Sequence, residues 1–192
     1  MSRRPDILGE FTAEHRAVED LLARIEAAPP LSGATGTDST AEPESTAGPE
    51  NAAGPEGAAE PAAPGGAAEP VDRLIGQLTD LLFSHCAAEE EHLFPVVQHD
   101  VADGGAMVFR CIHDHLAIGQ YLADLQSLPP GDPAPATLLR GLAELLRRHL
   151  ATEEKELFPA ARKALPAAAR NALAERLRAE RAEIAEAGPS GP

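Results

Sequence analysis

The sequence predicts an all-α protein built as an up-down four-helix bundle. In four segments the apolar residues recur at steps of three and four, which is the spacing of one buried helix face. The alternating β-branched pattern that is typical of strands is absent from the sequence. Two segments are also repeated further along the chain, which indicates two helix pairs related by an approximate two-fold axis.

The first pair of helices is separated by a long segment of different composition. The first helix is predicted from Glu10 to just before Pro29, because proline stops a helix. The second is predicted from Val71 to Phe94, where Pro95 is expected to kink or end it. Their apolar faces carry Phe11, Val18, Leu22 and Ile25, and Leu74, Leu78, Leu81 and Leu82, respectively.

Residues 29–70, between these helices, are expected to form a disordered acidic insert. The segment is almost wholly Ala, Gly, Pro, Glu, Ser and Thr, and it contains no aromatic residue, lysine or arginine. Leu31 is its only large aliphatic residue, so the segment cannot bury enough apolar surface to offset the entropy of ordering it.

The second pair of helices follows a turn signal at residues 103–105, and the Pro-rich stretch 129–135 separates its two members. The fourth helix is expected to continue to Phe158 or beyond. A last Ala/Arg/Glu-rich segment is expected to form a terminal helix that packs on the bundle or binds a partner. These elements divide the chain into a bundle, 1–165, and a C-terminal helix with its tail, 166–192. The apolar positions of the two main helices are Val108, Cys111, Ile118, Leu122 and Leu125, and Leu138, Leu142, Leu145, Leu146 and Leu150.

The internal repeat contains the chemically informative residues. The segment HCAAEEEHLFP, residues 85–95, returns as HLATEEKELFP, residues 149–159. A weaker repeat relates EHRAVEDLLARI, residues 14–25, to DHLAIGQYLADL, residues 114–125. The second match places His15 opposite His115, so each predicted helix pair has a histidine on both of its helices.

The spacing within the repeat predicts a metal site inside the bundle. Residues four apart lie on the same side of a helix, so His85 points with Glu89 and His149 points with Glu153. Leucines one turn earlier direct both pairs inward. Unpaired imidazoles and carboxylates in an apolar interior would cost several kcal/mol per charged group, and a metal offsets this cost. Nitrogen and oxygen donors without a thiolate cluster favour iron or manganese over structural zinc. The predicted ligands are His15, His85, Glu89, His115, His149 and Glu153.

These motifs resemble the hemerythrin-like HHE cation-binding family. The resemblance covers the chain except for the insert and the last helix, and it rests on the two repeated His-x3-Glu-Glu segments, each preceded by a helix with its own histidine. It implies a non-haem centre of two iron ions, bridged by carboxylates and an oxygen. Carried over, His15 and His85 bind one iron, His115 and His149 bind the other, and Glu89 and Glu153 bridge them.

One position departs from the oxygen-carrying members of that family. Those proteins have a fifth histidine one turn before the third-helix ligand, where this chain has Cys111. Without that histidine both irons keep an open position, which favours reaction with a small diatomic or peroxide ligand over reversible oxygen carriage. A thiolate ligand, a redox thiol and a core thiol are alternative roles for Cys111, and a core thiol is favoured.

Three functions are compatible with these features. The first is a di-iron protein that senses or reacts with O2, nitric oxide or peroxide. The second is a di-iron enzyme with peroxide-decomposing or oxidase activity. The third is a helical stress-response or interaction protein whose metal is mainly structural.

Several other residues are assigned less specific roles. Glu90 and Glu154 are expected to be solvated acids, because they lie about 100° around the helix from the ligand face. His92, with its repeat counterpart Glu156, is expected at the surface, with a position at the rim of the site as the alternative. Glu19, His99 and His113 are left out of the site. The aromatic residues expected in the core are Phe11, Phe83, Phe94, Phe109, Phe158 and Tyr121.

Charge and composition exclude several classes of partner. The formal net charge is -15, and the sequence has no basic stripe, so nucleic acid and membrane surfaces are not expected partners. No apolar run suits a leader or a membrane span, so a cytoplasmic location is expected. Cys86 and Cys111 lack the spacing of a disulfide framework and are expected to be free thiols. The sequence identifies no protein partner.

Overall fold

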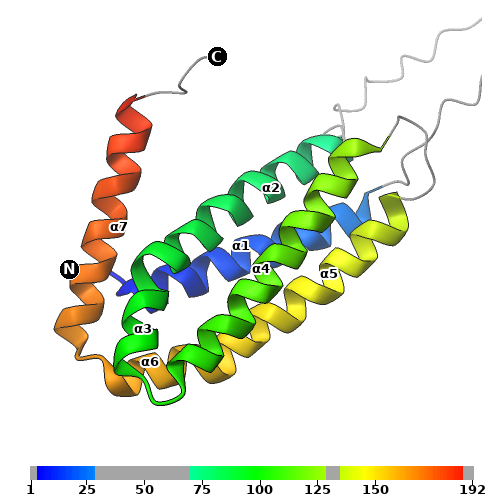
Figure 1. Cartoon of the computed structure of the whole chain (residues 1–192). Helices are drawn as coiled ribbons and strands as arrows, with labels where there is room; N and C mark the ends of the chain where they lie inside the picture. The colour runs from blue at the N-terminus through cyan, green and yellow to red at the C-terminus, as the bar shows by residue number, and fades with distance from the viewer. Residues whose placement is uncertain (1–3, 29–69, 129–134, 188–192) are drawn as a thin grey trace, which may run out of the picture.

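The computed structural model describes residues 4–28, 70–128 and 135–187. Within these ranges all regular secondary structure is helical, and four long helices run side by side with alternating directions (Figure 1). The prediction of an all-α up-down bundle is therefore confirmed, whereas the insert expected between the first two helices lies, except for Pro70, outside the described residues. The four helices are α1 (Ile7–Ala27), α2 (Val71–Ala88), α4 (Gly104–Ser127) and α5 (Pro135–Thr152).

Helix α1 begins three residues before the predicted start because Asp6 caps it. The Gly9 amide donates a hydrogen bond to Asp6 Oδ1 at 3.1 Å, which satisfies one of the free donors of the first turn. The added turn places Ile7 and Leu8 in the core, where both side chains are fully buried. The sequence contains this aspartate, but the spacing of apolar residues does not predict that a helix starts beside it.

Helices α2 and α5 both continue through a π-helical turn instead of ending at proline. Helix α2 passes through η1 (Glu89–Leu93) into α3 (Phe94–Asp100), and α5 passes through η2 (Glu153–Leu157) into α6 (Phe158–Ala164). In each turn the phenylalanine amide donates to the carbonyl five residues back, which belongs to Glu89 or Glu153. The next residue is Pro95 or Pro159, which lacks an N–H and would clash with the carbonyl of a regular turn. The wider turn accommodates the proline, so the helix continues.

The turn between α3 and α4 forms where the sequence predicts it. Asp103 has a left-handed backbone conformation, with φ at 58°. Next to it, a Cβ atom on Gly104 would lie 2.1 Å from the Val97 carbonyl oxygen. Only glycine fits this close approach, which brings α4 back against α3.

The core consists of two apolar clusters with a polar layer between them. On α1, Phe11 belongs to the cluster at the α3 and α6 end, Val18 belongs to the cluster at the other end, and His15 lies between them. The aromatic prediction is wrong for Phe83 and Phe109, which are 63% and 71% exposed. Each follows directly after an inward-facing residue of its helix and is therefore rotated about 100° towards solvent.

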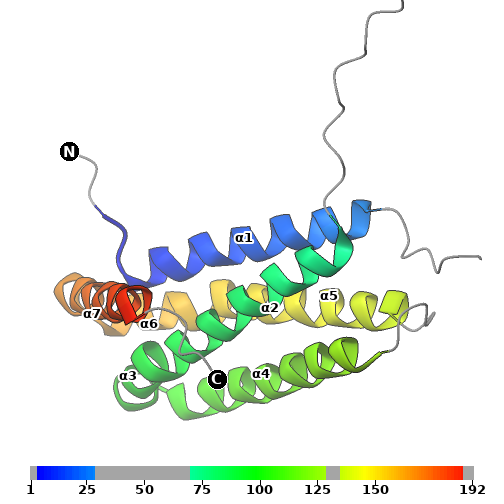
Figure 2. The same ribbon diagram turned by 90° about the horizontal axis from the view of Figure 1, so that it is seen from above.

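The terminal helix α7 (Ala167–Ala187) lies across one end of the bundle, beside the first half of α1 (Figures 1 and 2). Its narrow apolar face buries Leu173, Ala174 and Leu177 in the same cluster as Phe11. This helix therefore completes one end of the core. Among the described residues, none of the helices contains an apolar run of membrane-spanning length.

Candidate metal centre

The six ligands expected from the sequence lie together in the polar layer. They come from four helices and from the first residue of each π turn. All six side chains are buried, with relative exposures between 0% and 7%. They are His15 on α1, His85 on α2, Glu89 at the start of η1, His115 on α4, His149 on α5 and Glu153 at the start of η2.

The six side chains form two groups that share both glutamates. In each group the donor atoms lie within 4.8 Å of one another. Glu89 Oε2 lies 3.5 Å from His85 Nε2 and 3.4 Å from His115 Nε2. Glu153 faces the other two imidazoles, with His15 Nε2 at 3.3 Å and His149 Nε2 at 3.5 Å. One group contains His15 and His85, the other contains His115 and His149, and both contain Glu89 and Glu153.

The inward atoms of this cluster have no hydrogen-bond partners within the protein. These atoms are the Nε2 atoms of all four histidines and both carboxylate oxygens of each glutamate. Buried polar atoms without partners are costly, and this set consists of donor types that bind metal ions. Each of the two groups therefore has the donor atoms to hold a metal ion.

Acidic residues on neighbouring helices orient the histidines from behind. Three of them accept a hydrogen bond from an imidazole Nδ1–H, and Asp114 faces the fourth imidazole, that of His149, at 3.7 Å. With the proton held on Nδ1, the Nε2 lone pair points into the site. The three hydrogen bonds are His15 Nδ1 to Glu154 at 2.9 Å, His85 Nδ1 to Glu14 at 2.9 Å, and His115 Nδ1 to Glu90 at 2.8 Å.

The expectation that Glu90 and Glu154 are only solvated acids is therefore wrong. Both side chains are about half exposed, but each binds a histidine of another helix. The position of a residue on its own helix does not show its contacts with another helix, so the helical spacing did not predict these hydrogen bonds. The repeat did contain a usable signal, because acids occur at matched positions 14 and 114 and at matched positions 90 and 154.

The surface position expected for His92 is also wrong. Its side chain is buried, and its Nε2 lies 2.6 Å from Glu180 on α7. Its repeat counterpart Glu156 is exposed and pairs with Arg110 instead, at 3.1 Å. Sequence periodicity could not show this contact because it depends on where α7 packs. The residues left out of the site, Glu19, His99 and His113, are exposed.

The buried charges shift several pKa values in the metal-free protein. Burial and the neighbouring Glu153 raise the pKa of Glu89 well above its usual value. Burial lowers the pKa of His149 to about 4. For His115, burial lowers the pKa, but the neighbouring Cys86, the hydrogen bond with Glu90 and the charge of Glu153 together raise the pKa to about 9. His115 therefore holds an extra proton at neutral pH, and Glu89 keeps its proton to a higher pH than an ordinary glutamate does.

Metal binding is accordingly expected to release protons. His115 must lose its extra proton to become a ligand, so protons compete with the metal below its pKa of about 9, and the metal affinity increases with pH. Between pH 6 and 8 the apparent affinity should rise by about ten-fold per pH unit for each proton released. Calorimetric titration in two buffers of different ionisation enthalpy counts these protons. Binding heats that are independent of the buffer would contradict the assignment.

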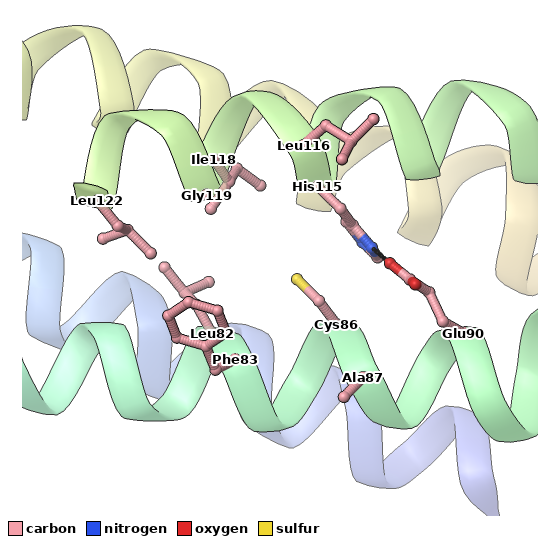
Figure 3. Close-up of a pocket in the computed structure, with 10 residues that line it drawn as sticks. All are labelled: Leu82, Phe83, Cys86, Ala87, Glu90, His115, Leu116, Ile118, Gly119 and Leu122. Atoms are coloured by element: carbon pink, nitrogen blue, oxygen red, sulfur yellow. Dashed lines mark hydrogen bonds and ion pairs between the residues drawn. The ribbon is translucent and has the colours of Figure 1, made fainter. Parts of the chain in front are cut away.

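A groove between α2 and α4 extends from the surface to one edge of the site (Figure 3). It has a volume of about 450 Å³ and is lined mainly by apolar side chains, including Leu82, Ile118 and Leu122. The hydrogen-bonded pair His115 and Glu90 lies at one end, and the sulfur of Cys86 also points into the groove. A small uncharged molecule can therefore approach His115 along an apolar path.

The fold and these residues together define a helical-bundle protein with a buried histidine and glutamate cluster able to bind metal. The family model of the hemerythrin HHE cation binding domain matches residues 6–161, and the chain belongs to this family. The match includes every residue of the cluster and ends before α7. No curated protein and no solved structure matched the chain.

Proposed function

We propose that this protein is a non-haem di-iron protein that senses or reacts with O2, nitric oxide or peroxide. In this proposal His15 and His85 hold one iron, His115 and His149 hold the other, and Glu89 and Glu153 are shared. The observation that supports it is the pair of four-residue groups with both carboxylates in common.

The donor set supports iron over a soft metal. Imidazole nitrogen and carboxylate oxygen suit iron or manganese, whereas sites rich in thiolate select zinc or copper(I). The two nearby cysteines are poor thiolate donors because burial raises the pKa of both thiols. When bound, two irons would supply redox chemistry that the side chains lack.

The surroundings of the site support a small ligand. The groove beside His115 is lined mainly by apolar side chains and ends at the hydrogen-bonded pair Glu90 and His115, so it suits a small uncharged molecule. Cys111, which replaces the fifth histidine of the oxygen carriers, is buried with its thiol near Glu153. A thiol is smaller than an imidazole, so this side of the centre keeps space for a ligand.

The test starts with protein loaded anaerobically with ferrous iron and analysed for metal content. We expect two irons per chain and a rapid change of the visible spectrum on mixing with O2, nitric oxide or peroxide. Sustained evolution of O2 from peroxide would instead favour the peroxide-decomposing enzyme. Two irons with no spectral response to any of the three ligands would favour a structural metal and overturn the proposal.

Changing Cys111 to histidine should shift the protein towards reversible oxygen binding. The new imidazole is one turn from His115 on α4 and lies beside Glu153, so it can occupy the open position on that side. Ferrous Cys111→His protein should react with O2 more reversibly than the parent, and any turnover of peroxide should fall. Stopped-flow spectra of both proteins measure this.

The matched control is Cys111→Ser, which keeps the side chain small. It should behave as the parent does. If Cys111→His holds two irons and still reacts as the parent does, then the side chain at this position does not reach the metals.

A further inference from the structure

Helix α7 is joined to α1 by a row of three ion pairs. The acids lie at steps of four along one face of α1, and each pairs with an arginine of α7. The first two pairs lie away from the metal cluster, whereas the third acid, Glu14, immediately precedes His15. The pairs are Arg170 with Asp6 at 2.7 Å, Arg178 with Glu10 at 2.5 Å, and Arg181 with Glu14 at 2.5 Å.

Glu14 differs from the other two acids because it is shared between α7 and the metal cluster. Its Oε1 accepts a hydrogen bond from Arg181, and its Oε2 accepts the Nδ1–H of His85 at 2.9 Å. Glu14 is 15% exposed and Arg181 is 34% exposed. A carboxylate bound on both oxygens has little rotational freedom, so Arg181 fixes the direction from which Glu14 holds the imidazole.

The same turn of α7 contacts the bundle at a second point near the cluster. Glu180 binds the buried His92, which lies in the π turn that begins with Glu89. Consecutive residues of α7 thus contact two elements that carry proposed ligands. Through these two contacts, the turn of α7 that carries Glu180 and Arg181 supports the side of the site formed by α1 and η1.

In the group that contains His115 and His149, the acid at the matched position makes longer contacts. Asp114, the repeat counterpart of Glu14, lies 3.7 Å from His149 Nδ1. Its other oxygen lies 3.7 Å from Arg148, a neighbour of His149 on the same helix. Both distances exceed a hydrogen bond, so His149 is held less firmly than His85.

We propose that Arg181 of α7 is a positioning residue for the metal centre, acting through Glu14 on His85. Through this contact, Arg181 gives the metal position at His15 and His85 a higher affinity than the position at His115 and His149. The inference depends on the proposed metal site, and it adds α7, which lies beyond the matched family domain, to the machinery of that site. Partners behind a metal ligand typically change metal affinity by about 10–100-fold, and Arg181 acts one contact further out, so we expect about ten-fold.

The experiment compares Arg181→Met with the matched control Arg178→Met. Both variants remove one arginine from the same face of α7 and keep most of its apolar stem, but Arg178 pairs with Glu10, which contacts neither site histidine in the ion pairs described. Anaerobic titration with cobalt(II), followed by its visible absorption, resolves two binding steps. We expect Arg181→Met to weaken the first step about ten-fold, and both steps of Arg178→Met to match the parent.

Two further measurements separate positioning from general stability. Arg181→Lys should recover part of the lost affinity, because lysine restores a charge-assisted hydrogen bond to Glu14. In the metal-free protein, nitrogen NMR should show that Arg181→Met, but not Arg178→Met, changes the tautomer of His85. Equal losses in both methionine variants, or no change in either step, would overturn the positioning role. If the parent binds no metal, both this inference and the proposed function fail, whereas a neutral Arg181→Met in a parent that binds two metals rejects only the inference.

Discussion

Replacing Glu89 or Glu153 with alanine should remove most of the bound metal from both positions. Each carboxylate faces one histidine of each group, so one substitution takes a ligand from both metals. It also leaves the remaining carboxylate alone among four imidazoles. We expect the metal content of each variant, measured by elemental analysis after loading and desalting, to fall from about two per chain to well below one.

Two sets of control variants accompany this prediction, one at exposed acids and one at acids that hydrogen-bond the histidines. Glu91→Ala and Glu156→Ala change exposed acids of the same two turns and should leave the metal content unchanged. Glu90→Ala and Glu154→Ala remove the partners of His115 and His15, so affinity should fall about 10–100-fold without loss of the site at saturating metal. Equal metal content in Glu89→Ala and Glu91→Ala would show that the shared carboxylates are not ligands.

Removing the metal should lower the thermal midpoint of the bundle by on the order of 10 °C. Eight inward nitrogen and oxygen atoms have no partner within the protein, so the metal-free state retains their full desolvation cost. A ligand at a thousand times its dissociation constant stabilises the folded state by ~4 kcal/mol. For a chain of this size each kcal/mol shifts the midpoint by about 2–4 °C.

Thermal unfolding followed by circular dichroism, with and without a chelator, measures the shift. The Glu89→Ala variant serves as the control, because it should hold little metal and so should be insensitive to the chelator. An unchanged midpoint after verified loss of metal would mean that the cluster is already satisfied by water or by protons.

The sequence was sufficient to predict the six residues of the buried cluster, because they follow from local rules. A spacing of four residues joins His85 to Glu89, and the repeat transfers the same pair to His149 and Glu153. It also selects His15 over His92, since only the former has a matching histidine. The structure brings all six residues into one buried layer.

The features that the sequence did not reveal depend on contacts between helices. The partner of His115 is Glu90 on another helix, and that of His92 is Glu180, 88 residues away in sequence. The repeat matches Glu90 with Glu154, but it does not show which helix each acid faces, and the contact of His92 with Glu180 has no counterpart in the repeat. Phe83 and Phe109 are exposed because their positions on the helix, and not their apolar character, decide which way they face.

The π turns also explain why a fifth histidine near the cluster stays out of it. His92 lies seven residues after His85, so in an uninterrupted α-helix it would stack two turns below it on the inward face. The turn that begins at Glu89 is closed by a hydrogen bond over five residues instead of four, so each residue within it turns through a smaller angle. This phase shift rotates His92 away from the metal layer and towards Glu180 on α7. A proline placed two residues beyond the turn thus controls which side chains of its own helix can reach the buried cluster.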